Sequence, residues 1–160
     1  MVELGVVYIP QQPGIFADMT VEENLQMGAW TFRRDTVRVR RALEEQYDRF
    51  PMLREKRRQK AGELSGGQQR MLEVARGLMA GPRVLLVDEP SAGLAVTIAR
   101  EVYTMLARLR DEGITIVLVD QDIRRALGIA DYVYVLDLGR NRAEGPPAQF
   151  GDLQKAFWTS

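Results

Sequence analysis

Three short, uninterrupted apolar runs constrain the fold of this chain most strongly. They occupy residues 4–9 (LGVVYI), 84–87 (VLLV) and 114–119 (ITIVLV). Runs without polar alternation are typical of strands that are buried on both faces of a parallel sheet. A helical pattern over residues 96–112 separates the second run from the third, as a parallel connection requires. We therefore predict an α/β fold in which helices flank a parallel sheet.

Capping signals and periodicity predict the remaining elements. Thr20 followed by Glu23 forms a capping box that opens a helix over residues 21–28. Further predictions are helices at 36–50, 65–80, 123–130 and 146–158, and a fourth strand at 132–136. The stretch from Thr20 to Lys60 interrupts the strand–helix rhythm. We predict that residues 20–62 form a helical insertion between residues 1–19 and 63–160 of one α/β core.

Composition excludes several function classes. The 160 residues are 46% hydrophobic, which suits one domain with its own core. Acidic and basic residues balance at 22 each, so no nucleic-acid partner is expected. The sequence holds no cysteine and no histidine, which excludes disulfides, thiol chemistry and a histidine base. It has neither a bilayer-length apolar run nor a basic leader, which predicts a cytoplasmic chain.

The stretch LSGGQQR at residues 64–70 has the composition of an anion site. Ser65 precedes a helical pattern and can cap its first N–H groups. Gly66 and Gly67 leave backbone N–H groups open to a ligand, and the helix dipole favours negative charge there. The alternative is an ordinary helix N-cap.

The second apolar run delivers two adjacent carboxylates, Asp88 and Glu89, in the sequence VLLVDEP. Sites in parallel sheets form at the carboxyl ends of strands. Asp88 is then a candidate Mg²⁺ residue, since Mg²⁺ prefers hard oxygen ligands, and Glu89 a candidate to polarise an attacking water. The alternative is a surface turn with two solvated acids.

The combination of LSGGQQR, a helix, VLLVDEPSAGL and VLVDQ resembles the nucleotide-binding subunit of ABC transporters over essentially the whole chain. The segments YIPQQPGIFADMTVEENLQMG, DEPSAGLA and VLVDQDIRRAL are similar to the branched-chain amino acid importers. The resemblance implies a partial P-loop NTPase-type parallel sheet with flanking helices and a helical-subdomain insertion. It also implies ATP and Mg²⁺ as cofactors.

The resemblance assigns site roles residue by residue. Asp88 is the magnesium residue and Glu89 the catalytic base. Gln11 is the Q-loop glutamine, which touches magnesium and the attacking water, with its neighbour Gln12 as second choice. The signature motif, which contacts the γ-phosphate of a nucleotide held by the other subunit of a head-to-tail dimer, is Ser65, Gly66, Gly67 and Gln68. The D-loop across the dimer interface is Ser91, Ala92, Gly93 and Leu94.

Two departures from the family pattern stand out. Gln121 occupies the usual position of a switch histidine, which we interpret as a subfamily trait because glutamine still donates to phosphate. No G-x-x-x-x-G-K-[ST] occurs, and none of the lysines, Lys56, Lys60 and Lys155, follows a glycine-rich turn. We therefore expect a truncated subunit without its N-terminal part. The resemblance implies that the loss includes a strand between residues 114–119 and 132–136, which would leave a gap in the sheet or two new edges.

The leading functional hypothesis is the ATP-hydrolysing subunit of an importer, inactive when isolated. Its expected partners are a second ATP-binding subunit and a transmembrane permease, on the inner face of the membrane. A non-catalytic interaction module acting in trans on an intact subunit or a permease is the main alternative. A soluble ABC ATPase of DNA repair or translation would carry a coiled-coil insertion or a second cassette, and the sequence shows neither.

Two interpretations apply to several residues of the insertion and to Asp120 at the end of the third strand. In the family, the insertion helps to form a cleft for a cytoplasmic permease helix, and a solvated surface or core packing is the alternative. The basic run at 54–60 is a solvated helix end or a docking surface for an acidic partner or lipid. Asp120 either supports the site or caps the next helix. The cleft candidates are Arg33, Arg34, Arg38, Arg40, Arg41, Phe16, Met19, Met27 and Trp30.

Overall fold

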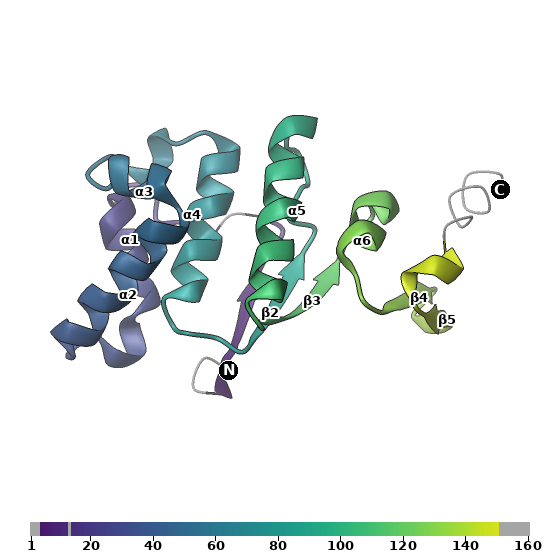
Figure 1. Ribbon diagram of the computed structural model, residues 1–160. Coiled ribbons are helices and arrows are strands. Elements are labelled where there is room, and N and C mark those ends of the chain that lie inside the picture. Colours follow the sequence, from purple (N-terminus) through teal and green to yellow (C-terminus); the bar gives the residue numbers. More distant parts are fainter. Residues whose placement is uncertain (1–3, 13, 151–160) are drawn as a thin grey trace. The chain divides into compact units, whose positions relative to one another are not determined.

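The computed structural model describes residues 4–12 and 14–150 (Figure 1). The chain divides into two compact units, Met1–Val119 and Asp120–Ser160. The first unit holds the parallel sheet, the predicted insertion and the LSGGQQR helix. The second unit begins directly after the third predicted strand.

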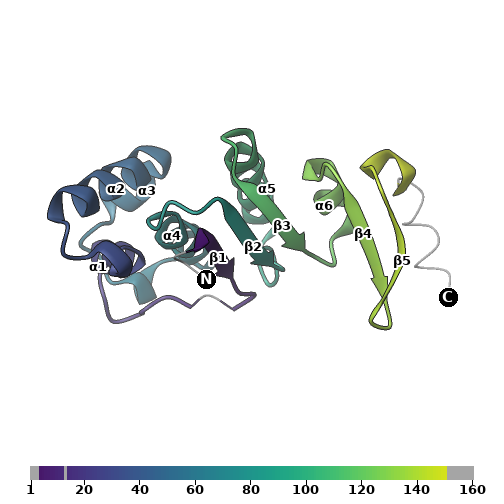
Figure 2. The same ribbon diagram turned by 90° about the horizontal axis from the view of Figure 1, so that it is seen from below.

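The sheet of the first unit is built from the three apolar runs. Strands β1 (Val6–Ile9), β2 (Val84–Asp88) and β3 (Thr115–Val119) lie in the order β1-β2-β3, and both pairs are parallel (Figure 2). Helix α5 (Val96–Asp111) connects β2 to β3. The predicted α/β fold with a parallel sheet is confirmed.

Only one face of this sheet is buried. On that face lie Val7 and Ile9, which contact Gly77 of helix α4 (Gly66–Leu78), and their β2 partners Leu85 and Val87. The opposite face carries Tyr8, Val117 and Val119, whose side chains are 50%, 50% and 59% exposed. Burial of these strands on both faces was therefore a wrong prediction. The continuous apolar runs gave no sign that helices would cover a single face of the sheet.

The insertion is helical, as predicted. It contains α1 (Val21–Gly28), η2 (Trp30–Phe32), α2 (Thr36–Arg49), α3 (Pro51–Glu55) and η3 (Ala61–Glu63). The capping box of α1 is present, with the Glu23 N–H donating to Thr20 Oγ1 over 3.2 Å and the Thr20 N–H donating to Glu23 Oε2 over 2.7 Å. Pro51 does more than interrupt the pattern, because it begins α3 at a position that suits its fixed φ.

Helix α1 packs very closely on α4. A Cβ atom at Gly28 would lie 2.0 Å from the backbone carbonyl oxygen of Arg76. The backbones of the two helices therefore approach each other so closely at Gly28 that no side chain would fit between them. The insertion and the LSGGQQR helix consequently form one packed block.

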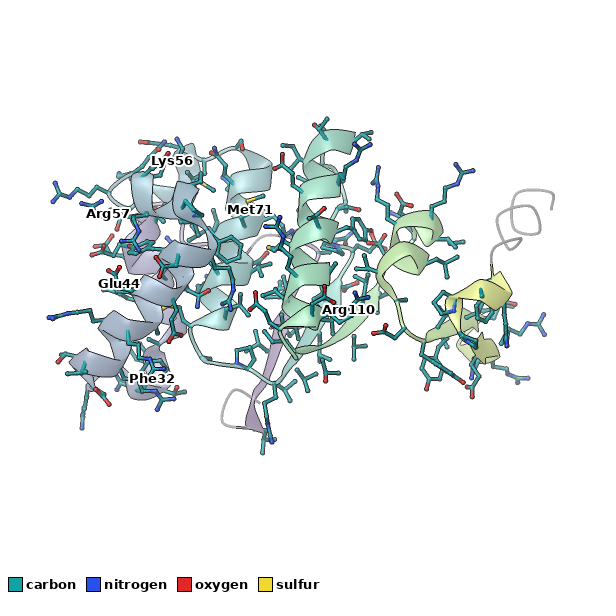
Figure 3. The ribbon with its side chains drawn as sticks, viewed as in Figure 1. Phe32, Glu44, Lys56, Arg57, Met71 and Arg110 are labelled. Carbon is teal, nitrogen blue, oxygen red and sulfur yellow. The ribbon has the colours of Figure 1, made fainter. Side chains whose placement is uncertain are left out.

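The basic and aromatic residues that were candidates for a cleft do not all lie in the same place. A cleft between α1 and α2 is lined by Arg33 and Arg40 together with Glu22, Tyr47 and Glu44, which is labelled in Figure 3. The other cleft candidates do not line it, and Phe16 and Trp30 are 44% and 56% exposed, so core packing is excluded for both. In the basic run, Arg54 forms ion pairs with Glu44 at 2.9 Å and Asp48 at 2.8 Å, as a solvated helix end would.

The second unit contains α6 (Ile123–Ile129), β4 (Val133–Asp137), β5 (Arg140–Gly145) and η4 (Pro147–Phe150). The fourth predicted strand exists, but it pairs with β5 in a separate antiparallel sheet and not with the parallel one. Strand β5 was not predicted, because its sequence RNRAEG has no apolar alternation. Most of the helix predicted at 146–158 lies outside the described residues.

Strand β3 is an edge of the parallel sheet, since within the described part of the chain it pairs with β2 alone. No helix of the described residues is both long and apolar enough to cross a membrane.

Candidate functional site

The carboxyl ends of β1 and β2 bring together side chains that are almost eighty residues apart in sequence. Gln11 Nε2, just beyond β1, donates a hydrogen bond of 2.7 Å to Glu89 Oε2, just beyond β2. The Tyr8 hydroxyl donates a hydrogen bond of 3.0 Å to Asp88 Oδ2. The carboxyl ends of adjacent parallel strands thus form one polar cluster, Tyr8, Gln11, Asp88 and Glu89, as expected for this edge of a sheet.

Glu89 is held in an uncommon backbone conformation. Its φ is 38°, in the left-handed region that is unfavourable for a residue with a Cβ atom. Its N–H donates to Val119 O over 2.8 Å, and its carbonyl oxygen accepts from the Ala92 N–H over 3.1 Å. These bonds and the Gln11 contact fix the conformation from three sides. Strain retained in this way is a feature of functional sites.

Tyr8 was not predicted as a site residue. In the parallel register it pairs with Leu86, and Asp88 follows two residues later on the same face of the sheet. The hydrogen bond to Asp88 raises the pKa of the Tyr8 phenol, so that Tyr8 remains a donor. The usable sequence signal was its hydroxyl group, because Tyr8 is the one residue of the run LGVVYI whose side chain carries a polar atom.

The LSGGQQR stretch begins α4 with a capping box. The Gln68 N–H donates to Ser65 Oγ over 3.4 Å, and the Ser65 N–H donates to Gln68 Oε1 over 3.1 Å. The predicted cap is therefore present. Gly66 is exposed, and a Cβ atom there would lie 3.5 Å from Leu94 Cδ2 in the turn after β2. The structure thus places the start of α4 beside the turn predicted to be the D-loop.

The two glycines of this stretch differ in environment. Gly67 is buried, and a Cβ atom there would lie 2.2 Å from Ile98 Cγ2 of α5. The expectation that both glycines open the helix start to a ligand therefore fails for Gly67. Its missing side chain lets α4 and α5 approach each other.

Replacement of Gly67 by alanine is expected to destabilise the protein by about 1–3 kcal/mol, because the new methyl group overpacks against Ile98. Urea unfolding followed by circular dichroism measures the loss. The double variant Gly67→Ala/Ile98→Ala should recover part of it, and Gly66→Ala is the matched control at an exposed neighbour. Equal effects of Gly66→Ala and Gly67→Ala would contradict this explanation.

A buried ion pair lies further along α4, the helix on which Figure 3 labels Met71. Arg70 Nη1 and Glu73 Oε2 are 2.8 Å apart, with side chains only 2% and 1% exposed. Burial raises the pKa of Glu73, against the opposing effects of the Gly14 N–H and of the Arg70 and Arg76 charges. Sequence analysis missed this pair. Its signal was opposite charges three residues apart inside the apolar helix pattern.

The remaining predicted residues lie elsewhere. Residues 91–93 form a turn, in which Gly93 has φ 71° and the Leu94 N–H donates to Ser91 O over 3.1 Å. Gln121 is exposed in the second unit, in the turn that precedes α6. Asp122 caps α6, and Asp120 accepts a hydrogen bond of 2.8 Å from the Asp122 N–H. Gln12 is exposed, next to Gln11.

The chemistry of the polar cluster suits a magnesium ion. Within residues 4–12 and 14–150, no three His, Cys, Asp or Glu side chains gather as a metal site. Mg²⁺ does not need such a group, because it keeps several waters and takes one or two carboxylates together with substrate phosphates. The fitting oxygen atoms are those of the Asp88 carboxylate and the Gln11 side-chain carbonyl, whose amide nitrogen is directed to Glu89.

Comparison with known proteins decides the family. The ABC transporter profile matches residues 2–92, which is more than half of the chain and includes Gln11, the LSGGQQR stretch, Asp88 and Glu89. The chain belongs to the ABC transporter family. Its resemblance to ABC nucleotide-binding subunits is thereby confirmed.

Two relatives in this ABC family are branched-chain amino acid transport ATP-binding proteins. BraG of Pseudomonas aeruginosa is 42% identical over 136 residues, which cover 85% of this chain and 58% of BraG. The probable LivF of Archaeoglobus fulgidus is 42% identical over 154 residues, which cover 96% of this chain and 64% of LivF. The chain therefore spans about three fifths of the length of these relatives.

Solved structures of ABC proteins share the fold. One is cbiO1 of Clostridium perfringens, part of the ABC transporter complex cbiONQ, with a TM-score of 0.83 and 25% identity over 98% of this chain and 62% of cbiO1. Another is an ATP-binding cassette of an ABC transporter in its ADP conformation, with a TM-score of 0.79 and 26% identity over 99% of this chain and 70% of that one.

Proposed function

We propose that this chain acts in the ATP-binding, ATP-hydrolysing subunit of an ABC importer for branched-chain amino acids. The observation that carries the proposal is the hydrogen bond from Gln11 to Glu89, which joins two separately predicted site residues at one sheet edge. The names of the two relatives at 42% identity support the class of solute.

In this proposal three residues of the polar cluster have separate tasks. Glu89 orients an attacking water and accepts its proton, and Gln11 directs both that water and the Glu89 carboxylate. Asp88 holds Mg²⁺, and Gln11 adds its carbonyl oxygen. Bound Mg²⁺ and ATP supply the electrophilic phosphorus and its charge neutralisation. In the second unit, Gln121 is proposed to donate a hydrogen bond to phosphate.

The start of α4 is proposed to serve a nucleotide held by another subunit. The exposed N-terminus of this helix offers backbone N–H groups at Gly66 and the positive end of the helix dipole. The sequence has no G-x-x-x-x-G-K-[ST] cradle for a nucleotide of its own. Ser65, Gly66 and Gln68 therefore complete a site in trans, with Ser91, Ala92, Gly93 and Leu94 at the subunit interface.

The proposed partners follow from this arrangement. They are a second ATP-binding subunit, homologous to the relatives above, and a transmembrane permease. The chain then works as a peripheral component on the inner face of the cell membrane. The helical insertion at residues 20–62, with its cleft between α1 and α2, is the proposed contact for the permease.

The experiment that tests the proposal measures ATP binding and turnover by this chain, alone and mixed with a purified full-length ATP-binding subunit. We expect no turnover by the chain alone, and in the mixture ATP binding beyond that of the full-length subunit by itself. Gly66→Asp in this chain should abolish that increase, because it places a carboxylate where a phosphate would lie. The matched control is Gly128→Asp, at an exposed glycine of α6 with open space around it. Turnover by the isolated chain that disappears in Glu89→Gln would contradict the expectation that the chain is inactive alone.

A non-catalytic module acting in trans is the second candidate, favoured by the intact helix start and the absent phosphate-cradle motif. The two candidates differ in one respect. A module that only supplies the start of α4 would stimulate the intact subunit equally with glutamate or glutamine at position 89. A catalytic subunit would lose this stimulation in Glu89→Gln.

A further inference from the structure

Helix α4 holds the backbone of the loop that carries Gln11. Arg70 Nη1 donates to Pro10 O over 2.6 Å, and Arg70 Nη2 donates to Gln11 O. The Gly14 N–H donates to Glu73 Oε1 over 2.6 Å, and Arg76 Nη1 donates to Gly14 O over 2.6 Å. Three side chains spaced three residues apart on one helix thus bind four backbone groups of the loop, which belong to Pro10, Gln11 and Gly14.

Stability alone does not account for this arrangement. Arg70 and Glu73 are almost completely buried, and Arg70 Nε is a buried atom without a hydrogen-bond partner in the described structure. A buried ion pair of this kind contributes no more to stability than well-packed apolar side chains would. What the pair provides is the fixed position of the Pro10 and Gln11 carbonyl groups.

We propose that Arg70, Glu73 and Arg76 are positioning residues, which set the place of Gln11 against Glu89 and couple it to the start of α4. The meaning of the Gln11–Glu89 contact rests on the proposed function, whereas the positioning role concerns the contact itself. The hydrogen bonds described above run from these residues to the backbone of the loop. The residues act through this backbone.

The geometry gives the coupling its direction. Arg70 lies five residues after Ser65, about one and a half turns along the same helix. Glu89 is attached elsewhere, through its N–H bond to Val119 on β3. A displacement of the start of α4 therefore moves the Gln11 carbonyl through Arg70, whereas it reaches the Glu89 backbone by a different route, the turn at residues 91–94. A ligand at Ser65–Gln68 would alter the Gln11–Glu89 distance through Arg70.

The far end of the loop is fixed to the same helical block. Asn24 of α1 is fully buried, and its Oδ1 accepts from the Phe16 N–H over 2.8 Å while its Nδ2 donates to Phe16 O over 2.9 Å. Helix α1 packs on α4 at Gly28 without space for a side chain. Both ends of the loop are therefore attached to one packed unit, which strengthens the coupling.

The test uses nuclear magnetic resonance on the full ¹⁵N-labelled chain without nucleotide. The Gln11 side-chain amide reports the contact with Glu89, and its signal should shift in Glu89→Ala. In Arg76→Met or Glu73→Leu backgrounds, the same Glu89→Ala change should no longer shift it. The Gly14 amide should exchange with solvent about tenfold faster or more, because it loses a bond to a charged acceptor in Glu73→Leu. Arg76→Lys, which keeps a donor, should restore the response.

Arg41→Met is the matched control, since Arg41 is an exposed arginine of α2 that pairs only with Glu45 nearby. It should leave the Gln11 response unchanged. If Glu73→Leu does not fold, Arg76→Met decides, because it leaves the buried pair intact. A full Gln11 response in folded Arg76→Met overturns the positioning role. This readout needs no ATP, so a failure of ATP binding would count against the proposed function alone.

Discussion

Arg70→Leu is expected to lower the free energy of unfolding by about 3–5 kcal/mol, the largest stability effect predicted for a single side chain here. The substitution leaves the Glu73 carboxylate buried without its cationic partner, and it removes the donors to Pro10 O and Gln11 O. An uncompensated buried charge costs more than the ion pair contributed. Urea unfolding followed by circular dichroism at neutral pH measures the loss.

Two controls give this prediction its specificity. Arg70→Leu/Glu73→Leu should be more stable than Arg70→Leu alone, because the stranded carboxylate is gone. Arg41→Leu removes a side chain that is 82% exposed and should change the unfolding free energy by less than about 1 kcal/mol. A loss for Arg70→Leu no larger than that for Arg41→Leu would show that the buried pair is dispensable.

Glu89→Gln is expected to reduce ATP turnover by the chain in complex with an intact ATP-binding subunit by about 10²–10⁴-fold. The amide cannot accept a proton from water, but it keeps the size of the carboxylate and a carbonyl oxygen for the Gln11 hydrogen bond. ATP binding by the complex should therefore persist while turnover is lost. Single-turnover kinetics and filter binding separate the two quantities.

The matched control for this substitution is Glu101→Gln, on the exposed surface of α5. It removes the same charge from a side chain outside the polar cluster and should leave turnover unchanged. Turnover in Glu89→Gln within a factor of two of the wild type would refute the role of Glu89 as base. Equal losses in both variants would indicate a general charge effect.

Much of the fold could be predicted from local patterns. The parallel strands, the capping boxes at Thr20 and Ser65 and the helical insertion all follow from short sequence signals. These signals involve residues close together in the sequence, so they can be recognised without knowledge of tertiary packing. Exposure of Val117 and the separate pairing of β4 with β5 depend on which surfaces other elements cover. Sequence periodicity within one strand contains no information about that.

Most residues of the candidate site could be predicted from the sequence, but the contacts between them could not. Gln11 and Glu89 were each found from motifs, yet their contact depends on the register of β1 and β2. Tyr8 and Glu73 were missed because neither belongs to a motif, and their importance comes from tertiary contacts. Gly67 was predicted to leave space for a ligand, but in the structure its missing side chain leaves space for a methyl group of Ile98. The position does require a glycine, and the reason is the neighbouring helix α5.

The edge position of β3 has a consequence for the polar cluster. Val119 uses its carbonyl oxygen to hold the Glu89 N–H on the β2 side, and the other side of β3 has no strand partner among the described residues. A strand that added itself along this open side would stiffen β3 and the Val119 carbonyl with it. The strained backbone of Glu89 would then be held more firmly. Strand pairing at the sheet edge would thus affect the position of the Glu89 carboxylate through the Val119 carbonyl, without contacting any side chain of the polar cluster.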